Sequence, residues 1–90
     1  MTPEEILEIA AEYDSNLLYP TGMEKAVIGI VERFGMSPQI LMDKEMCIKI
    51  LMDRDGMARD EAVEFFEFNI IGAGMGDGTP CFATIYRSTK

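Results

Sequence analysis

Residues 60–80, DEAVEFFEFNIIGAGMGDGTP, join the clearest helical pattern of this chain to its only glycine-rich loop. The repeat of three and four residues predicts a helix with two different faces. The acidic face holds Glu61, Glu64 and Glu67, and the apolar stripe expected to face the core holds Ala62, Phe66, Asn69 and Ile70. The loop that follows holds Gly72, Gly74, Gly76, Gly78, Thr79 and Pro80. This junction is where we first expect a functional feature.

The size of the chain predicts one globular domain over residues 1–90. Two cores in 90 residues would each approach the size that needs disulfides or metals for stability. The composition, 48% hydrophobic and 27% charged, is typical of globular domains. No apolar run is long enough to span a membrane, and no basic residue precedes Lys25, so we expect no secretory signal and a cytoplasmic location.

The charge of the chain restricts its partners. Sixteen acidic and eight basic residues give a net charge of −8, and residues 1–24 contain six acids and no base. Binding to duplex DNA or to anionic lipid depends on Lys and Arg, so direct contact with either is not expected. A host protein with a basic surface is the partner that this charge favours, although an acidic surface also serves solubility alone.

The residue types needed for most catalytic and metal sites are missing. The chain has no histidine, and its two cysteines, Cys47 and Cys81, lack CxxC spacing. Most hydrolase triads and most zinc sites are therefore excluded. Residues 53–56, DRDG, resemble part of a calcium-binding loop, but Leu51 and Ala62 occupy two principal ligand positions. We expect no metal, no cofactor and no enzymatic activity, with Cys81 as a nucleophile being the enzymatic alternative.

The predicted element order is α-β-β-α-α-β, an α+β domain with helices on one face of a three-stranded, mainly antiparallel sheet. Thr2, Pro3 and Glu5 form a capping box that begins the first helix. Asp43 is the expected N-cap of a later helix, which Gly56 ends. The expected helices are at about 3–13, 44–55 and 59–71, and the last strand is at about 82–86.

The segment 23–34 fits two structures. Its apolar spacing suits a helix, whereas its β-branched residues and Gly29 suit a strand. We favour an antiparallel hairpin that pairs about 26–33 with 38–42 through a turn at FGMS, and the helix remains the alternative.

Three strings, AVIGIVERFGM, MDKEMCIKILMDRDGM and DEAVEFFEFNIIGA followed by GxxTPxF, resemble a family of small proteins found in bacteria and their phages. The resemblance covers residues 26–82, and FEFN…GA…G…TP is its most specific part. It implies a similar shape and a mobile-element context, and no catalytic residue. Relatives usually carry Ser or Thr where Ala58 stands and an aromatic residue where Gly74 stands. The resemblance therefore implies that this chain lacks the helix N-cap at Ala58 and the aromatic side chain of the loop at Gly74.

The glycine loop has a structural and a functional interpretation. Glycine-rich loops bind phosphate through backbone amides, but they normally follow a strand and precede a helix, whereas this loop follows a helix end, whose partial negative charge repels phosphate. A tight structural turn is therefore favoured. Asn69 is expected to be buried and to hold the loop through its side-chain amide.

Eight methionines in 90 residues suggest an adaptable binding surface as well as core packing, and Met57 and Met75 flank glycine turns. The leading hypothesis is an acidic, non-enzymatic module that binds and modulates a host protein, as a phage or mobile-element accessory or inhibitor. The residues predicted to bind the partner are Glu4, Glu8, Glu12, Glu61, Glu64, Glu67, Met57 and Met75. The alternative is a protein that sequesters a nucleotide or another small molecule at loop 72–80. The expected oligomeric state is a monomer or a homodimer.

Overall fold

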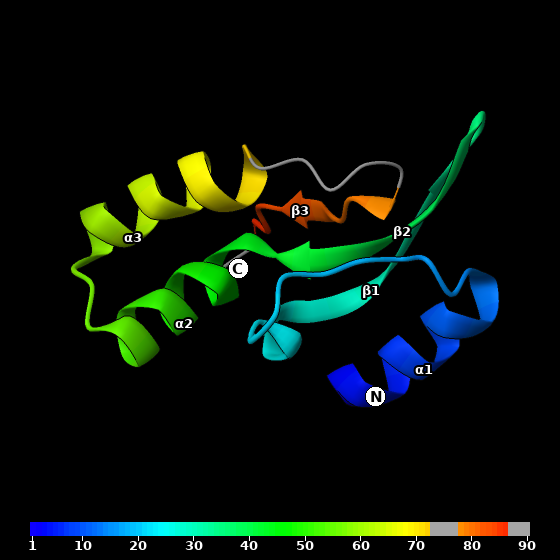
Figure 1. The fold of residues 1–90 in the computed structure, drawn as a ribbon, viewed down its shortest axis with the longest axis horizontal. Coiled ribbons are helices and arrows are strands. Elements are labelled where there is room, and N and C mark those ends of the chain that lie inside the picture. Colours follow the sequence, from blue (N-terminus) through cyan, green and yellow to red (C-terminus); the bar gives the residue numbers. More distant parts are fainter. Residues whose placement is uncertain (73–77, 87–90) are drawn as a thin grey trace.

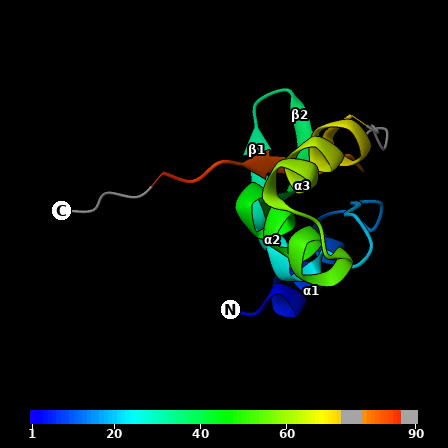
Figure 2. The same ribbon diagram turned by 90° about the vertical axis from the view of Figure 1, so that its left-hand side faces the viewer.

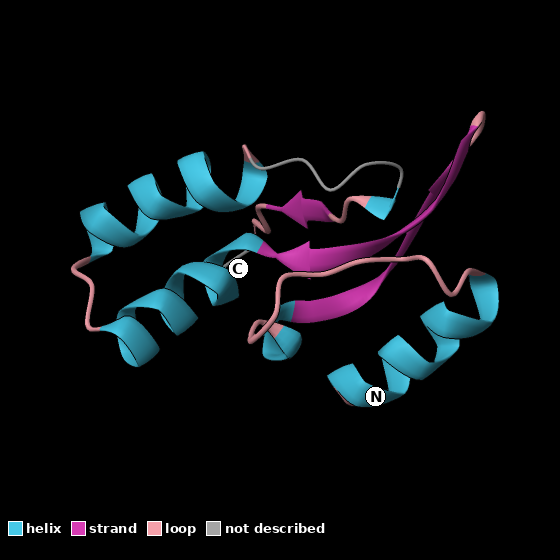
Figure 3. Ribbon diagram, viewed as in Figure 1, coloured by secondary structure: helices cyan, strands magenta, loops and turns pink. Residues whose placement is uncertain are grey.

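The computed structural model describes residues 1–72 and 78–86 as an α+β fold (Figure 1). The elements are α1 (Pro3–Tyr13), the short 3-10 helix η1 (Glu24–Ala26), β1 (Val27–Arg33), β2 (Met36–Asp43), α2 (Lys44–Asp55), α3 (Arg59–Phe66), the π-helical turn η2 (Glu67–Ile71) and β3 (Cys81–Ala83). Figure 3 shows the three strands between the helices at the two ends of the molecule. The predicted fold class and element order are confirmed. No helix in the described part of the chain is long and apolar enough to cross a membrane.

The sheet has the order β1-β2-β3. β1 and β2 form the predicted antiparallel hairpin, so the helical alternative for residues 23–34 is wrong except for the single turn of η1. Gly35, at a φ of 82°, makes the turn tighter than expected, because only glycine readily adopts this backbone conformation. β3 pairs with β2 in parallel over Leu41, Met42 and Asp43, which makes the sheet mixed.

The helices cover one face of the sheet. Ile30 pairs with Ile40, and Met42 pairs with both Val27 and Phe82, so the side chains of these five residues share one face. Figure 2 shows α1, α3 and the connection after α1 on the same side of the strands. The core between these layers consists of Ala10, Met23, Ala26, Val27, Ile40, Met42, Cys47, Ile48, Leu51, Ala62, Phe66 and Ile70.

Local signals fix the helix ends as expected. The Thr2 hydroxyl accepts a hydrogen bond from the Glu5 amide, and the Glu5 carboxylate accepts one from the Thr2 amide. These bonds lower the pKa of Glu5. Asp43 caps α2 by accepting from the amide of Glu45, and Gly56 ends α2 at a φ of 69°. The first backbone amides of a helix have no partner within the helix, and side chains of neighbouring residues accept their hydrogen bonds at the starts of α1 and α2.

Candidate functional site

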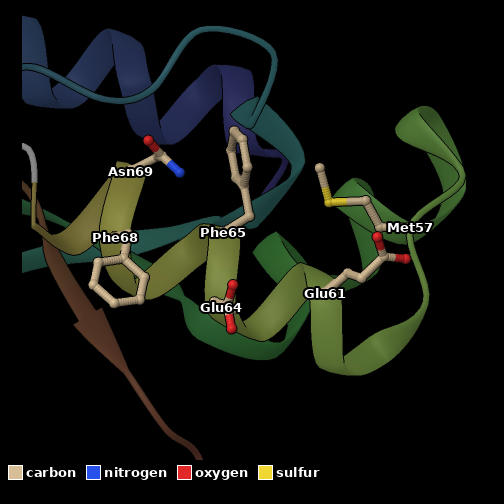
Figure 4. Close-up of a pocket in the computed structure, with 6 residues that line it drawn as sticks. All are labelled: Met57, Glu61, Glu64, Phe65, Phe68 and Asn69. Carbon is tan, nitrogen blue, oxygen red and sulfur yellow. The ribbon is translucent and has the colours of Figure 1, made fainter.

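The exposed side of α3 and η2 forms an open hollow of about 380 Å³. It is lined by Met57, Glu61, Glu64, Phe65, Phe68 and Asn69, which we call the α3 hollow. Figure 4 shows Phe65 between Met57 and Glu61 on one side and Phe68 and Asn69 on the other. Glu61, Glu64 and Phe65 are spaced as on one face of α3, and Phe68 and Asn69 follow in η2.

The opposite face of the same helix is buried. Ala62, Phe66 and Ile70 lie in the core, and Phe66 contacts Phe82 of β3 edge to face. By contrast, Phe68 is 75% exposed and Phe65 37% exposed. A large exposed aromatic beside another is typical of a contact surface, because a protein gains nothing from leaving it in water.

The burial of Asn69 was predicted wrongly, because its side chain is exposed and lines the hollow. The cause is the π-helical turn η2, which the sequence pattern did not indicate. A π turn holds more residues than an α turn, so each residue is rotated less about the helix axis. Ile70 therefore follows Phe66 on the buried side, and the Asn69 side chain points to solvent. The expected contact of Asn69 with the middle of the glycine loop falls outside the described residues.

Gly72 closes this wide turn. Its amide donates to the Glu67 carbonyl at 3.2 Å. A Cβ at Gly72 would lie 2.9 Å from the Phe68 carbonyl oxygen and 3.0 Å from that of Glu67. Only glycine fits this position without displacing the backbone, so Gly72 maintains the turn that presents Phe68 and Asn69.

Two of the predicted acids belong to the hollow. Glu61 and Glu64 are exposed, and none of the described residues that line the cavity with them is basic. Glu61 also accepts a hydrogen bond from the Ala58 amide at 3.1 Å, which partly replaces the missing cap of α3. The hollow therefore combines an apolar floor with a negative rim. Such a surface attracts cationic, apolar groups.

Glu67 does not join this group. Its carboxylate lies 2.9 Å from the Lys44 ammonium, which also lies 5.7 Å from the centre of the Phe66 ring. Because this ion pair is half exposed, we assign it a minor role in attaching α3 to the start of α2.

The predicted α1 acids lie elsewhere. Glu4, Glu8 and Glu12 are exposed on α1, which lies at the end of the molecule away from α3 (Figure 1). The two acidic groups therefore do not form one continuous surface. Glu4 lines a separate groove of about 710 Å³ together with Gly22, Glu24, Lys25, Met46, Lys49, Ile50, Asp53 and Arg54. The acidic and basic residues of this groove are equal in number, so the groove has no electrostatic preference for a cationic or an anionic ligand.

The described ends of the glycine loop support its structural interpretation. A Cβ at Gly78 would lie 2.5 Å from the Asn16 carbonyl oxygen, and the Gly78 carbonyl accepts a hydrogen bond from the Leu18 amide at 3.1 Å. Pro80 is buried and Thr79 partly so. Gly74, Met75 and Gly76 lie outside the described residues, so the predicted partner contact of Met75 and the small-molecule site at loop 72–80 remain predictions.

The two cysteines have different surroundings. Burial, with a smaller effect of Asp43, raises the pKa of Cys47 to about 12, so its thiol is unreactive at neutral pH. Cys81 is half-buried and donates to the Gln39 side-chain oxygen at 2.8 Å. Within residues 1–72 and 78–86, no group of three His, Cys, Asp or Glu side chains is placed to hold a metal ion.

Comparison with protein-family models, with curated proteins and with solved structures finds no match. The resemblance to the bacterial and phage family therefore remains a prediction. The assignment of the α3 hollow as a candidate binding site therefore depends on its geometry alone. Phe65 and Phe68 were not predicted as site residues, although the apolar residues at 62, 63, 65, 66 and 68 extend around more of the helix than one buried face needs.

Proposed function

We propose that this chain is a non-enzymatic protein-interaction module that binds a cationic, apolar segment of a partner protein through the α3 hollow. The observation that supports the proposal is the exposure of Phe68 and Phe65 on the helix face that also carries Glu61 and Glu64. Aromatic anchors surrounded by polar groups are the usual composition of binding hot spots.

The partner surface is defined by complementarity. Apolar side chains would cover Phe65, Phe68 and Met57, and flanking Lys or Arg would face Glu61 and Glu64. A basic amphipathic helix has both features on one side. The mobile-element context implied by the family resemblance makes a host protein the natural source of such a segment.

The two kinds of contact contribute differently. Burial of a Phe side chain is worth about 1.5–3 kcal/mol, whereas an exposed ion pair is worth about 0.2–1 kcal/mol. The aromatic rings would therefore supply most of the affinity, and the acids would supply orientation, association rate and salt dependence. We expect a dissociation constant of about 10–100 µM for a single helix, because ordering the peptide offsets much of the gain.

The test is a fluorescence-anisotropy titration with a synthetic amphipathic helix of leucine and lysine as the probe. Phe68→Ser should weaken binding at least about tenfold, and Glu64→Lys should weaken it several-fold at low salt. Glu8→Lys is the matched control, because it makes the same charge change on exposed α1. It should alter binding less than about twofold, since screening limits charge effects beyond about 10 Å.

A second probe, with glutamate in place of lysine, tests whether the negative charge of Glu61 and Glu64 contributes to binding. It should bind at least about tenfold more weakly. Equal binding of both probes, or equal effects of Glu64→Lys and Glu8→Lys, would contradict the proposal.

A further inference from the structure

The face of the sheet that the helices leave uncovered is mainly apolar, which we call the open face. The register places seven side-chain positions on it: Gly29, Val31, Gln39, Leu41, Asp43, Cys81 and Ala83. All are partly exposed. In an antiparallel sheet that faces water, these alternate positions are normally polar. Here Gln39 and Asp43 are the polar ones among the described positions. The Gln39 side chain accepts a hydrogen bond from Cys81 within the face, and the Asp43 carboxylate accepts one from the Glu45 amide at the start of α2.

The open face carries less negative charge than the side of the sheet where the helices lie. Asp43 is the only Asp, Glu, Lys or Arg residue among these seven positions, and Glu32 and Arg33 lie at the border of the face beside Gln39 and Cys81. The acids of α1 and α3 lie on the other side of the sheet, where the helices are (Figure 2). Two copies that met through their open faces would keep most of their negative charge apart, which reduces the repulsion expected from a net charge of −8.

An extended segment leaves the molecule on this same side. Pairing of β3 with β2 ends at Ala83, and residues 84–86 then run away from the body (Figure 2). Ile85 is 39% exposed and Tyr86 is 90% exposed. Among the described residues, no backbone hydrogen bond joins residues 84–86 to the body. An apolar, extended segment of this kind is suited to cover a neighbouring surface.

We propose that the open face and residues 84–86 form a symmetric homodimer, in which Ile85 and Tyr86 of each copy cover the open face of the other. The donor segment and the acceptor face lie on the same side of one chain, so one self-complementary two-fold contact uses both at once. The dimer places the two α3 hollows on its outside. The proposal uses a different face from the α3 hollow and does not depend on the function proposed for it.

The expected interface is of modest size. A Tyr side chain buries about 150–250 Å², and a stable interface buries about 800 Å² on each partner. The extension therefore supplies part of the interface, and the open face supplies the rest. We expect a dimer that forms and dissociates in the micromolar concentration range.

Sedimentation velocity over a range of concentrations tests the proposal. The average mass should rise from 10.1 kDa to twice that value and stop there. Tyr86→Ser should raise the dissociation constant at least about tenfold, and Ile85→Ser should raise it less. Phe34→Ser is the matched control, because Phe34, like Tyr86, is a highly exposed aromatic residue but lies in the β1–β2 turn. It should dimerise like the unmodified chain.

Cys81 gives a second readout. Iodoacetamide should label Cys81 several-fold more slowly at concentrations where the dimer forms, and Tyr86→Ser should remove this protection. A chain that stays monomeric up to about 1 mM, assembly beyond the dimer, or undiminished dimerisation of Tyr86→Ser would each overturn the proposal.

Discussion

The rings of Phe66 and Phe82 meet edge to face, with centroids 5.0 Å apart and planes at 89°. This contact joins α3 to β3 across the covered face of the sheet. Phe66 is fully buried, whereas Phe68, two residues further along, is 75% exposed. The same short helical segment therefore contributes one phenylalanine to the core and presents another to solvent.

The first prediction separates these two roles. Phe66→Ala should lower the free energy of unfolding by about 3–5 kcal/mol, because it removes a buried ring and leaves a cavity. Phe68→Ala should change it by less than about 0.5 kcal/mol. Urea unfolding at low protein concentration measures both. Similar losses in the two variants would show that the two faces of α3 are wrongly assigned.

The second prediction concerns the uncapped start of α3. Ala58 has the extended backbone of an N-cap, with φ −69° and ψ 161°, but no side-chain oxygen. Ala58→Ser should therefore raise the free energy of unfolding by about 1 kcal/mol. Thermal unfolding measures the gain, and Thr2→Ala, which removes the existing cap of α1, should show a loss of similar size. An unchanged melting temperature for Ala58→Ser would contradict the assignment of the cap.

The third prediction concerns close backbone contacts at the ends of the glycine loop. Gly78→Ala should destabilise the protein by about 1–3 kcal/mol, because the added methyl group meets the Asn16 carbonyl. Gly72→Ala should also destabilise the protein, because the added methyl group would meet the carbonyl oxygens of Glu67 and Phe68. Gly29→Ala is the control, since a Cβ added there would meet nothing within 4 Å. Chemical denaturation compares the three, and a neutral Gly78→Ala would contradict a tightly packed loop end.

The fourth prediction uses the ion pair between α2 and α3. Arg59 donates two hydrogen bonds to Glu45, at 2.7 and 3.0 Å, and these bonds lower the pKa of Glu45 below its ordinary value of 4.5. A lowered pKa in the folded state means that the carboxylate adds stability above pH 4.5 and loses this contribution as the pH falls through the folded-state pKa.

Glu45→Gln should therefore melt at a lower temperature than the unmodified chain at neutral pH, and the difference should disappear once the pH falls below the folded-state pKa of Glu45. Because both groups are well exposed, the difference should be small and should also shrink in high salt. Differential scanning calorimetry at several pH values checks this. A difference that grows as the pH falls would contradict the direction of the shift.

The parts of the fold that were predicted correctly depend on contacts between residues close in sequence. The Thr2–Glu5 capping box, the Asp43 cap and the Gly56 stop each act over a few residues, so the sequence pattern was sufficient. The β1–β2 hairpin was likewise a local choice, which β-branched residues decided.

The errors came from contacts over longer distances and from one local irregularity. The pairing of Lys44 with Glu67 spans 23 residues, and Glu67 is not among the residues that line the α3 hollow, which the sequence pattern did not indicate. The direction of β3, which the correct expectation of a mainly antiparallel sheet left open, depends on the path of the whole chain. The π turn at residues 67–71 displaced Asn69 from the buried stripe, and a regular helical period does not anticipate this.

The central claim is that the α3 hollow is the binding surface, and amide chemical-shift mapping tests it most directly. The unlabelled leucine–lysine helix is titrated into isotope-labelled protein, in Tyr86→Ser to remove any effect of dimerisation. We predict that the largest shifts occur at Met57, Glu61, Glu64, Phe65, Phe68 and Asn69, and that Phe68→Ser abolishes them. Shifts centred on α1 or on the charged groove beside it, or no shifts at all, would contradict the claim.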